Sequence, residues 1–565
     1  MPNTPLPSRN PCLPAIITLY ILVLYSFGVF DHSLWTPDEP RVAAVARSVA
    51  EGAWVVPQLN DQPFLEQPPL FYWIVALFFR TFGLDEPFRA RVVATLFCLG
   101  GIAFTYLLVR RLVPSRQTAQ TVGWLTTWCL ALTLEYFHTA HRLVVDSALV
   151  FFTCGASHAT LCLLQANGRH HRINWAIWAS SLASAAFLTK GVIGLAVPTL
   201  FGVAAIFVTR RESSADATAH PRLPFPIELL WIPPLVFAVV AGPWLYSLAT
   251  ELGNQGFKTL LFDNTIARVV PSLAGDRAHV RPFYYYLSLP AHAVPTLFFV
   301  IGGVVHRFSR RAPPTKAERQ AYDVLLVWAL AGLLMLSLAS TKRAAYFVPF
   351  FPAVAGIAGI WLNAFLSGRQ GRYETALPYV LAVFLFIGGL ALVVTPIVVP
   401  SLPTVTLLLG AGLAAGFGWG TVRAVGRRGR SAGLVVWGTG LLCATTFACA
   451  GLLPATDRMK SLAKVSREVA ARVPREDTLY AFDPDETTLG MIPLYAGRPL
   501  VGIDDSAQIA SLLQKVGSIY VLAVDKTYRR RQRRFDALEA FPTELLLKDE
   551  RPSSRAFRLY RLTAP

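Results

Sequence analysis

Acidic and basic residues recur in the polar turns between the long apolar segments of this chain. The first such turn is "WTPDEPR" (35–41), in which Asp38 and Glu39 are adjacent and Arg41 follows two residues later. A carboxylate can orient or deprotonate an acceptor group, and a guanidinium or ammonium group can neutralise a departing phosphate. Together these residue types indicate group transfer from a phosphate-linked substrate.

Later turns supply groups of the same kinds. A phosphate ester held at a membrane surface explains why they lie at the ends of apolar segments, because a headgroup stays in water while its hydrocarbon chain stays in lipid. The residues are Glu66 before "PPLFYW", Asp146, Lys190, and Lys342 with Tyr346 in "STKRAAYF".

Each of these residues also has a structural explanation. Thr36 and Glu39 have the spacing of a capping box, and acids at a helix N-terminus are stabilised by the helix dipole by about 0.3–1 kcal/mol. Lys342 could extend to the lipid headgroups, and Asp146 could begin a helix. Only their accumulation on one side of a membrane favours a shared reaction site.

The composition indicates an integral membrane protein. Of 565 residues, 54% are hydrophobic and only 15% are charged, and the mean hydropathy is +0.46. One soluble core cannot bury so much apolar surface. The net charge of +18 does not indicate nucleic-acid binding, because the basic residues cluster in short loops, where they set membrane orientation. The seven cysteines lie in or beside apolar segments and match no disulfide framework or zinc motif.

Fourteen apolar segments approach the length needed to cross a bilayer core of about 30 Å. Basic loops such as "RRLVPSR" (110–116) mark cytoplasmic ends, and their alternation leaves the segment 69–84 unable to cross. We therefore expect about thirteen transmembrane helices, with 69–84 lying at the outer face. The segments are 12–31, 69–84, 90–112, 119–137, 143–165, 174–189, 191–209, 227–248, 285–305, 322–340, 343–366, 377–399, 402–422 and 432–453.

The residues after 453 have a different pattern. Short β-rich stretches such as "SIYVLAV" alternate with helical stretches such as "SAQIASLLQKV". We therefore expect a transmembrane domain, 1–453, with outer loops at 32–89 and 249–284, followed by a soluble α/β domain, 454–565. The parity of the crossings places both loops and the soluble domain on the extracytoplasmic side.

The first outer loop resembles that of the aminoarabinose transferases that modify lipid A and, more distantly, that of the protein O-mannosyltransferases. It carries D-E-x-R, E-x-P-P and Y-W in order within 35–83. The resemblance continues through "RLVVDSALVFF" (142–152), "FLTKGVIGLAVP" (187–198), "HVRPFYYYL" (279–287) and "STKRAAYFVPFFPA" (340–353). It implies a GT-C type, α-helical polytopic glycosyltransferase of the bacterial inner membrane. Such an enzyme is inverting, and it takes its sugar from undecaprenyl or another polyprenyl phosphate on the periplasmic side.

The resemblance also implies roles for individual residues. The matching positions make Asp38 the central carboxylate, with Arg41 beside it and Asp146 in the same cavity, so these three are the catalytic candidates. The candidates for substrate binding are Glu39, Glu66, Arg142, Lys190, Arg268, Lys342 and Tyr346.

Two positions depart from the family pattern. Gln67 stands where the family usually has a lysine after the glutamate, and Val42 stands where it often has a tyrosine. Loss of the lysine removes a phosphate contact. Lys190, Arg142 and Arg268 are the residues that could supply this contact instead.

A metal site is a further implication of the resemblance. In the family, the E-x-P-P glutamate and the histidine before the aromatic run can bind zinc, and here these residues are Glu66 and His279. Two protein ligands make a weak site. We therefore expect that no cofactor is required and that a divalent metal such as zinc is an optional ligand.

The sequence leaves alternatives open. The acceptor is either lipid A, whose ionised phosphate needs only orientation, or a hydroxyl of a protein or glycan, which needs a general base. The sugar is aminoarabinose-like or a hexose. A transporter or flippase for a lipid-linked solute is an alternative of another class. It would place charges near the membrane midplane, whereas the charges here lie at segment ends.

Overall fold

The computed structural model describes residues 12–36, 38–84, 86–113, 116–215, 227–260, 262, 284–310, 313–339, 341–368, 371–398, 404–526, 533–550 and 555–564. The chain forms two compact units. The helical unit comprises Met1–Val29, Leu65–Phe71 and Arg91–Ala450. The α/β unit comprises Phe30–Phe64, Tyr72–Ala90 and Gly451–Pro565. The division near residue 451 agrees closely with the expected boundary, but most of the first outer loop folds with the C-terminal residues instead of with the helices.

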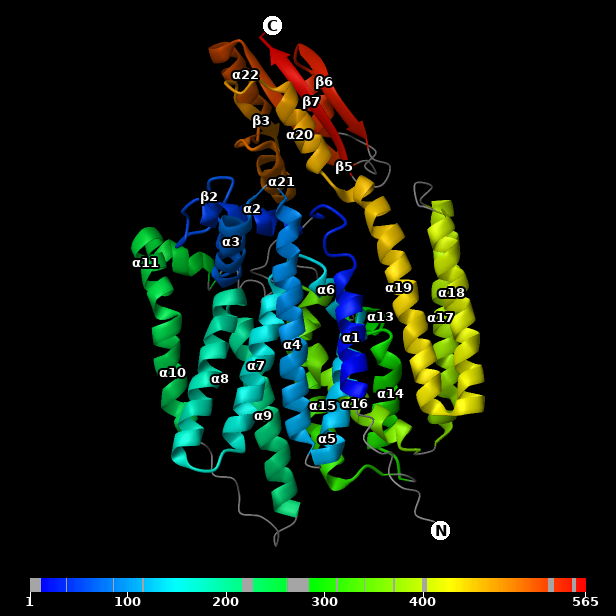
Figure 1. Cartoon of the computed structure of the whole chain (residues 1–565). Coiled ribbons are helices and arrows are strands. Elements are labelled where there is room, and N and C mark those ends of the chain that lie inside the picture. Colours follow the sequence, from blue (N-terminus) through cyan, green and yellow to red (C-terminus); the bar gives the residue numbers. More distant parts are fainter. Residues whose placement is uncertain are drawn as a thin grey trace, which may run out of the picture. The chain divides into compact units, whose positions relative to one another are not determined.

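The helical unit consists almost entirely of α-helices (Figure 1). Its helices are α1 (Leu13–Ser26), α4 (Arg91–Leu112), α5 (Arg116–Leu132), α6 (Leu134–Ala140), α7 (Asp146–Leu164), α8 (Arg169–Lys190), α9 (Val192–Ala215), α10 (Glu228–Val240), α11 (Gly242–Phe257), α13 (Tyr284–His292), α14 (Thr296–Arg307), α15 (Lys316–Leu338), the 3-10 helix η5 (Ala344–Phe350), α16 (Phe351–Leu366), α17 (Arg372–Val398), α18 (Thr404–Arg428) and α19 (Arg430–Lys460), whose last residues count with the α/β unit.

Among the described residues, eight helical segments are long and apolar enough to cross a membrane. They are Pro87–Leu112, Asp146–Leu164, Val192–Arg211, Lys316–Leu338, Ala344–Leu366, Arg372–Ile397, Thr404–Arg428 and Arg430–Asp457. The pair α10 and α11, bent by 50°, adds a ninth if it counts as one broken span. The apolar helices α1 and α14 have only 14 and 12 residues. The chain is therefore a multi-pass membrane protein, and the total of thirteen crossings stays a prediction.

Three expected segments, 119–137, 227–248 and 285–305, each form two α-helices instead of one, and the division of 227–248 between α10 and α11 is the 50° bend described above. The segment 119–137 is divided at Thr133, whose backbone is extended with a ψ of 118° between α5 and α6. The segment 285–305 is divided before α14, where Pro295 is the N-cap residue. Proline ends the preceding helical hydrogen-bonding pattern because it has no N–H to donate. Hydropathy alone did not locate these breaks.

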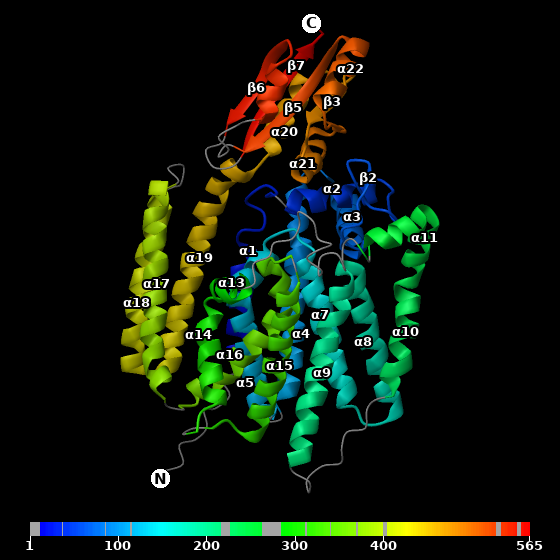
Figure 2. The same ribbon diagram turned by 180° about the vertical axis from the view of Figure 1, so that it is seen from behind.

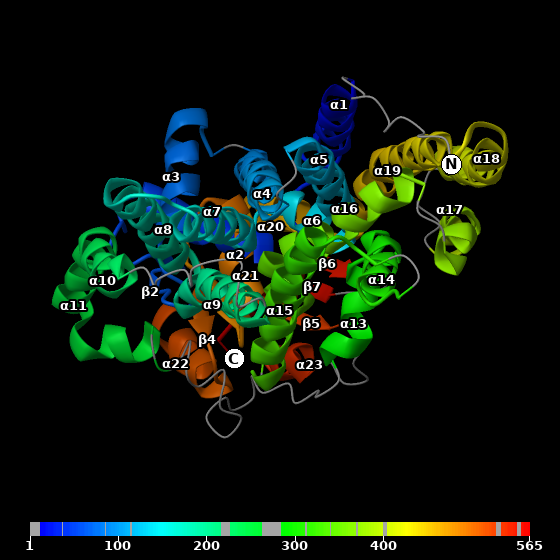
Figure 3. The ribbon, with the colours of Figure 1, turned by 90° about the horizontal axis from the view of Figure 1, so that it is seen from below.

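The helices α7 and α16 form the centre of the helical unit. Of the most apolar stretch within α7, 78% is buried, and of that within Ala344–Leu366, which comprises η5 and α16, 83% is buried. The corresponding stretch of α17 is only 17% buried. α7 packs against α4, α8 and α9, while α16 packs against α5, α14 and α15 (Figure 2). At one edge of this unit, α17, α18 and α19 lie together (Figure 3). These outer helices expose large apolar side chains, as lipid-facing helices do.

The α/β unit contains a five-stranded mixed sheet with the strand order β4-β3-β5-β7-β6. β3, β4 and β5 are parallel, while β7 is antiparallel to β5 and β6. The intervening α21 and α22 provide the crossovers that parallel strands require. Alternate residues of β5 contribute to two cores, Leu522 and Val524 to one, and Val521 and Ala523 to the other. The sheet is thus covered on both faces.

The elements of the α/β unit come from both ends of the sequence. They are α2 (Asp38–Ala50), β1 (Gln58–Leu59), β2 (Gln62–Pro63), α3 (Leu70–Phe82), η1 (Pro87–Ala90), α20 (Ala463–Arg472), β3 (Leu479–Phe482), α21 (Glu486–Ala496), β4 (Val501–Ile503), α22 (Ser506–Val516), β5 (Ser518–Lys526), α23 (Arg533–Glu539), β6 (Thr543–Glu550) and β7 (Arg555–Thr563). The helix α2 packs against α21. Asn60 donates from Nδ2 to the carbonyl oxygen of Leu500 across 2.6 Å.

The helix α3 was expected to lie at the membrane surface without crossing. Its 13 residues span about 20 Å, which is less than the about 30 Å of a bilayer core. Arg80 donates from Nε and Nη2 to the carbonyl oxygen of Ala50, and its guanidinium lies over the ring of Trp54. These contacts explain the arginine inside an apolar helix. The length of α3 is too short for a straight crossing, and its position at the outer membrane surface stays a prediction.

Candidate active site

The helical unit contains a buried ion pair between Asp146 and Lys190. Asp146 is the first residue of α7 and Lys190 is the last residue of α8, and these neighbouring helices pack against each other. Lys190 Nζ lies 2.5 Å from Asp146 Oδ1, and the two side chains are 13% and 10% exposed. An acid at a helix N-terminus and a base at a helix C-terminus are both favoured by the helix dipoles. The sequence analysis identified both residues, and the structure pairs them.

Tyr346 completes a three-residue cluster. It lies on η5, which packs against α7, and Lys190 Nζ lies 4.8 Å from the centroid of its ring. The cation–π contact and the salt bridge together hold the ammonium group of Lys190 from two sides. An ammonium group has three N–H donors, so Lys190 can also donate to a ligand oxygen. The cluster of Asp146, Lys190 and Tyr346 is called the lysine cluster below.

Three more predicted residues belong to the helical unit but have different surroundings. Lys342 is buried and donates to the carbonyl oxygen of Ala339 in the turn that leads to η5. Arg142 lies between α6 and α7, four residues before Asp146. Glu66 is half-buried in the segment before α3. The structure places these residues without testing their predicted roles in substrate binding.

Gln67 stands where the resembling family usually has a lysine, and its side-chain oxygen is buried. Its Oε1 atom is buried and has no hydrogen-bond partner among the described residues. A buried acceptor left without a donor costs about 1–3 kcal/mol. Gln67 can therefore accept a hydrogen bond from a bound molecule at low cost.

Sequence reasoning missed a buried carboxylate in the same unit. Glu135 on α6 is 7% exposed at its side chain, and Oε2 lies 2.7 Å from Nδ1 of His292 on α13. The Nδ1 atom of His138 lies 3.8 Å from Glu135 Oε1. Nearby, the backbone N–H of Leu134 donates to the carbonyl oxygen of Val294. These bonds attach α6 to the segment that joins α13 and α14.

In the α/β unit, Asp38 and Arg41, which were predicted to lie beside each other, form an ion pair. Arg41 Nη2 lies 3.1 Å from Asp38 Oδ1, one helical turn earlier on α2. Arg41 Nη1 also lies 2.8 Å from Oε2 of Glu486, the first residue of α21, and its guanidinium lies over Phe64 at 5.8 Å. Arg41 therefore orients the Asp38 carboxylate and is itself held by groups from three segments. Sequence reasoning missed Glu486, because nothing in the local pattern links it to α2.

Glu39 is completely buried at the start of α2. Its Oε2 atom accepts a hydrogen bond from the backbone N–H of Trp35 across 2.7 Å. A buried carboxylate that binds a backbone N–H beside a helix start favours a structural role. The predicted role of Glu39 in substrate binding stays a prediction.

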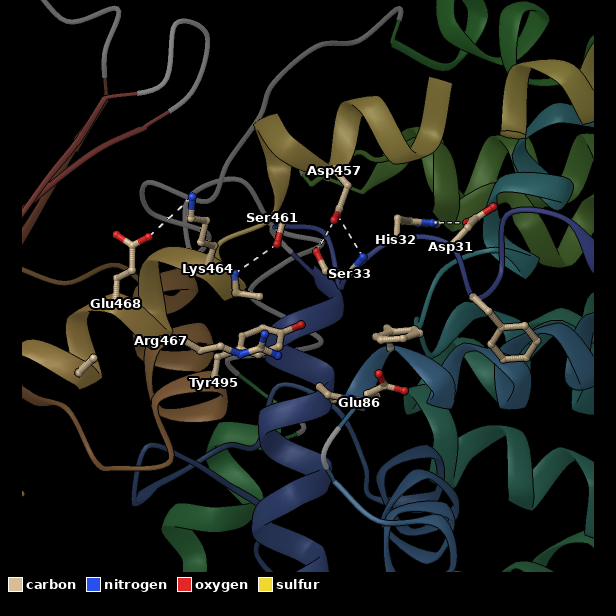
Figure 4. A pocket seen from close by; sticks show the side chains of 15 residues that line it. Asp31, His32, Ser33, Glu86, Asp457, Ser461, Lys464, Arg467, Glu468 and Tyr495 are labelled. Carbon is tan, nitrogen blue, oxygen red and sulfur yellow. Dashed lines mark hydrogen bonds and ion pairs between the residues drawn. The ribbon is translucent and has the colours of Figure 1, made fainter. Parts of the chain in front are cut away.

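A cavity of about 620 Å³, lined by both polar and apolar side chains, lies within the α/β unit (Figure 4). The segment 31–33 forms one wall, residues 86–88 form another, and the end of α19 with α20 and Tyr495 forms the rest. The charged side chains around it are mixed in sign and include Asp31, Glu86, Asp457, Lys464, Arg467 and Glu468.

Two sequence candidates, Arg268 and His279, lie outside the described residues. Within the described part of the chain, no group of three or more His, Cys, Asp or Glu side chains could hold a metal ion. The predicted zinc site at Glu66 and His279 therefore stays a prediction. Asp38 and Arg41 belong to one unit and the lysine cluster to the other, so their convergence on one substrate is also a prediction.

The comparisons with known proteins agree with the resemblance seen in the sequence. The family described as dolichyl-phosphate-mannose-protein mannosyltransferase matches residues 66–237. The chain is 26% identical over 362 residues to an undecaprenyl phosphate-α-4-amino-4-deoxy-L-arabinose arabinosyl transferase from Shewanella sediminis, covering 64% of this chain and 61% of the relative. A protein of the same description from Erwinia tasmaniensis is also 26% identical, over 60% of this chain and 57% of the relative. The chain thus matches about three fifths of the length of these curated relatives.

The similarity of folds extends over nearly the whole chain. The crystal structure of ArnT from Cupriavidus metallidurans in the apo state superposes with a TM-score of 0.74 at 19% identity, covering 98% of both chains. The structure of the same protein bound to undecaprenyl phosphate superposes with a TM-score of 0.73 at 20% identity, again covering 98% of both chains. The chain has the GT-C type fold of a polytopic membrane protein with a C-terminal α/β unit, as predicted. The particular proteins that it resembles are the aminoarabinose transferases.

Proposed function

We propose that this chain is an inverting glycosyltransferase of the bacterial inner membrane. It takes an aminoarabinose-like sugar or a hexose from undecaprenyl or another polyprenyl phosphate and transfers it to lipid A or another envelope acceptor on the periplasmic side. The lysine cluster carries the proposal, because it presents a largely buried ammonium group where the start of α7, a helix long and apolar enough to cross a membrane, meets the end of α8. The solved fold neighbour whose title names bound undecaprenyl phosphate supports the choice of donor.

The proposed reaction gives different tasks to Lys190 and Asp38. Lys190 donates to a phosphate oxygen of the donor, and the charge that develops on the leaving phosphate strengthens this bond in the transition state. Asp38, oriented by Arg41, aligns the acceptor oxygen for attack on the anomeric carbon. The new acceptor–carbon bond forms as the carbon–phosphate oxygen bond breaks, and the polyprenyl phosphate leaves with the electron pair. A hydroxyl acceptor gives its proton to Asp38, whereas an ionised phosphate acceptor has none to give.

The nature of the acceptor separates two versions of the proposal. The names of the curated relatives favour the aminoarabinose reaction, and we propose lipid A as the acceptor by analogy with it. The family match over residues 66–237 carries the name of a protein mannosyltransferase, which favours a hydroxyl of a protein or glycan. Only the second version needs Asp38 as a general base.

The test is transfer by the purified full chain in lipid vesicles. It is incubated with undecaprenyl phosphate-linked 4-amino-4-deoxy-L-arabinose and lipid A, and in parallel with polyprenyl phosphate-linked mannose and a serine-containing peptide. Mass spectrometry of lipid A and peptide identifies the product. A mass increase of either acceptor supports a glycosyltransferase and selects the version. Movement of the lipid-linked sugar across the vesicle membrane without transfer to any acceptor would instead identify a flippase.

A further inference from the structure

Asp457 makes an unusually dense set of hydrogen bonds with the segment that precedes α2. Its Oδ1 atom accepts from the backbone N–H of Ser33 across 3.0 Å and from Ser33 Oγ across 2.6 Å (Figure 4). The same oxygen accepts from Trp35 Nε1 across 2.9 Å. All three donors lie more than 420 positions earlier in the sequence, but in the same α/β unit. Hydrogen bonds to an ionised acceptor are about twice as strong as neutral ones. One carboxylate oxygen therefore fixes two residues of the segment.

Trp35 is held from several directions at once. Its ring lies 4.3 Å from that of His32, and Lys460 Nζ lies 4.6 Å from the ring. Its backbone N–H donates to Glu39 Oε2, as described above. Asp457 thus fixes the side chain of Trp35, while Glu39 fixes its main chain.

This arrangement connects Asp457 with the catalytic candidate Asp38. Glu39 is the neighbour of Asp38 in the first turn of α2, and Trp35 lies three residues before Asp38. The direction in which a chain enters a helix sets the direction of the side chains in its first turn. Catalytic rates are sensitive to such placement, since a displacement of about 1 Å can cost about 100-fold.

We propose that Asp457 is a positioning residue for Asp38, acting through Trp35 and Glu39. The inference rests on the proposed function, because it takes Asp38 as the acceptor-orienting carboxylate. It assigns a positioning role to the end of α19, next to the cavity, in a region that neither the sequence motifs nor the family match at 66–237 include. A purely structural role would lower stability but leave the turnover of the folded enzyme unchanged.

The test compares four variants of the full chain in the transfer assay. Asp457→Ala removes the acceptor, Asp457→Asn keeps a neutral acceptor, and Trp35→Phe removes only the indole donor. Asp504→Asn is the matched control, because Asp504 is an exposed acid in the same unit. We expect kcat to fall by about 100-fold in Asp457→Ala, in keeping with a displacement near 1 Å, and by less in Asp457→Asn and Trp35→Phe. The KM for the donor should stay within about twofold of wild type in all four variants. The kcat of the control variant Asp504→Asn should also stay within about twofold of wild type.

Coupling provides a second measurement. Trp35→Phe added to Asp457→Ala should lower kcat no further, because both changes break the same hydrogen bond. A folded Asp457→Ala variant with wild-type kcat would overturn the proposal. If Asp457→Ala does not fold, the result rests on Trp35→Phe and Ser33→Ala, and wild-type kcat in both would overturn it.

Hydrogen exchange separates a failure of this inference from a failure of the proposed function. In Asp457→Asn, the hydrogen-bonded amide of Trp35 and the amides of α2 from Arg41 onward should exchange faster than in wild type, while those of β5 and β7 stay unchanged. Unchanged exchange in α2 would overturn the inference whatever the activity. If the wild-type chain transfers no sugar but exchange in α2 is faster in Asp457→Asn than in wild type, the proposed function is rejected. The inference that Asp457 positions the start of α2 would then still hold.

Discussion

Lys190 Nζ lies 2.5 Å from Asp146 Oδ1, and this one salt bridge joins the start of α7 to the end of α8. The two helices have 19 and 22 residues and are joined by a short connection, so that at about 1.5 Å per residue the start of one returns to the end of the other. The hairpin geometry therefore creates the pair, although 44 positions separate the residues.

Removal of the ammonium group tests the lysine cluster. We expect Lys190→Met to reduce transfer by at least about 100-fold, because a single lost charge-stabilising donor costs about 10²–10³ in kcat. The measurement is kcat with the polyprenyl phosphate-linked donor. The variant also leaves Asp146 without its ion-pair partner, which costs about 3–5 kcal/mol where the pair is buried.

A control must separate lost stability from lost chemistry. Arg172 and Glu228 form another ion pair, with Nε and Oε1 3.0 Å apart, about 27 Å along α8 from Lys190; the Glu228 side chain is buried and that of Arg172 is 32% exposed. Glu228→Gln should lower the melting temperature of the chain but leave kcat within about twofold of wild type. Equal losses of kcat in both variants would contradict a special role for Lys190.

Asp38 is the second group to test. Asp38→Asn keeps the size of the side chain and an oxygen for Arg41 but loses the negative charge, and we expect transfer to fall by about 10²- to 10⁴-fold. The measurement is the transfer rate with a hydroxyl acceptor and with lipid A.

Glu486→Gln is the matched variant for Asp38→Asn. Glu486 is 60% exposed, and exposed ion pairs contribute about 0–1 kcal/mol, so transfer should fall by no more than about fivefold. Normal transfer by Asp38→Asn would remove this residue from the mechanism, whatever the result for Glu486.

Gln67 offers a gain-of-function test. A lysine at this position would add the donor that the resembling family has, where Oε1 now lacks a partner among the described residues. A hydrogen bond to a charged group contributes about 1.5–3 kcal/mol, so Gln67→Lys should lower the Kd for undecaprenyl phosphate by about tenfold or more. Gln67→Met, which has similar length and no charge, should not tighten binding. An unchanged Kd in Gln67→Lys would show that this position does not contact the phosphate.

The lowered pKa of Asp485 leads to a prediction of how the stability of the α/β unit responds to acid. Partial burial raises the pKa of this carboxyl, but hydrogen bonds and charge from Arg555, with hydrogen bonds from Thr488, outweigh that effect and hold the pKa below the usual 3.8. A lowered folded-state pKa contributes stability that is present above the unfolded-state value, and this stability is lost as the pH falls through the folded-state value. The unit should therefore lose stability below about pH 4.

Hydrogen exchange of the β7 amides, corrected for the intrinsic effect of pH on exchange, measures this loss. Arg555→Met should make the α/β unit less stable at pH 7 and less sensitive to acid, because the carboxyl then loses its principal partner. Arg561→Met is the control, since the Arg561–Glu544 pair is 4.0 Å apart and largely exposed. The same acid response in Arg555→Met as in wild type would contradict the role assigned to this pair.

The sequence by itself determined the class of the protein and most of the residues at its candidate site. Hydropathy and charge identify a multi-pass membrane protein, because a lipid environment requires long apolar helices with basic cytoplasmic loops. The short motif around Asp38 and the charges Asp146 and Lys190 are visible without a structure, because they lie at the ends of apolar segments on the side expected to be extracytoplasmic. The change of pattern near residue 453 indicates where the C-terminal part of the α/β unit begins, but not that segments of the first outer loop belong to the same unit.

Only the tertiary structure decided how these residues are paired. The contacts of Arg41 with Glu486 and of Asp457 with Ser33 and Trp35 join segments more than 420 positions apart, and no local pattern encodes such distances. The same is true of the pairing of Glu135 with His292 and of the placement of the first outer loop in the C-terminal unit. Local sequence fixes helices and turns through nearest neighbours, whereas these contacts depend on how the whole chain folds back on itself.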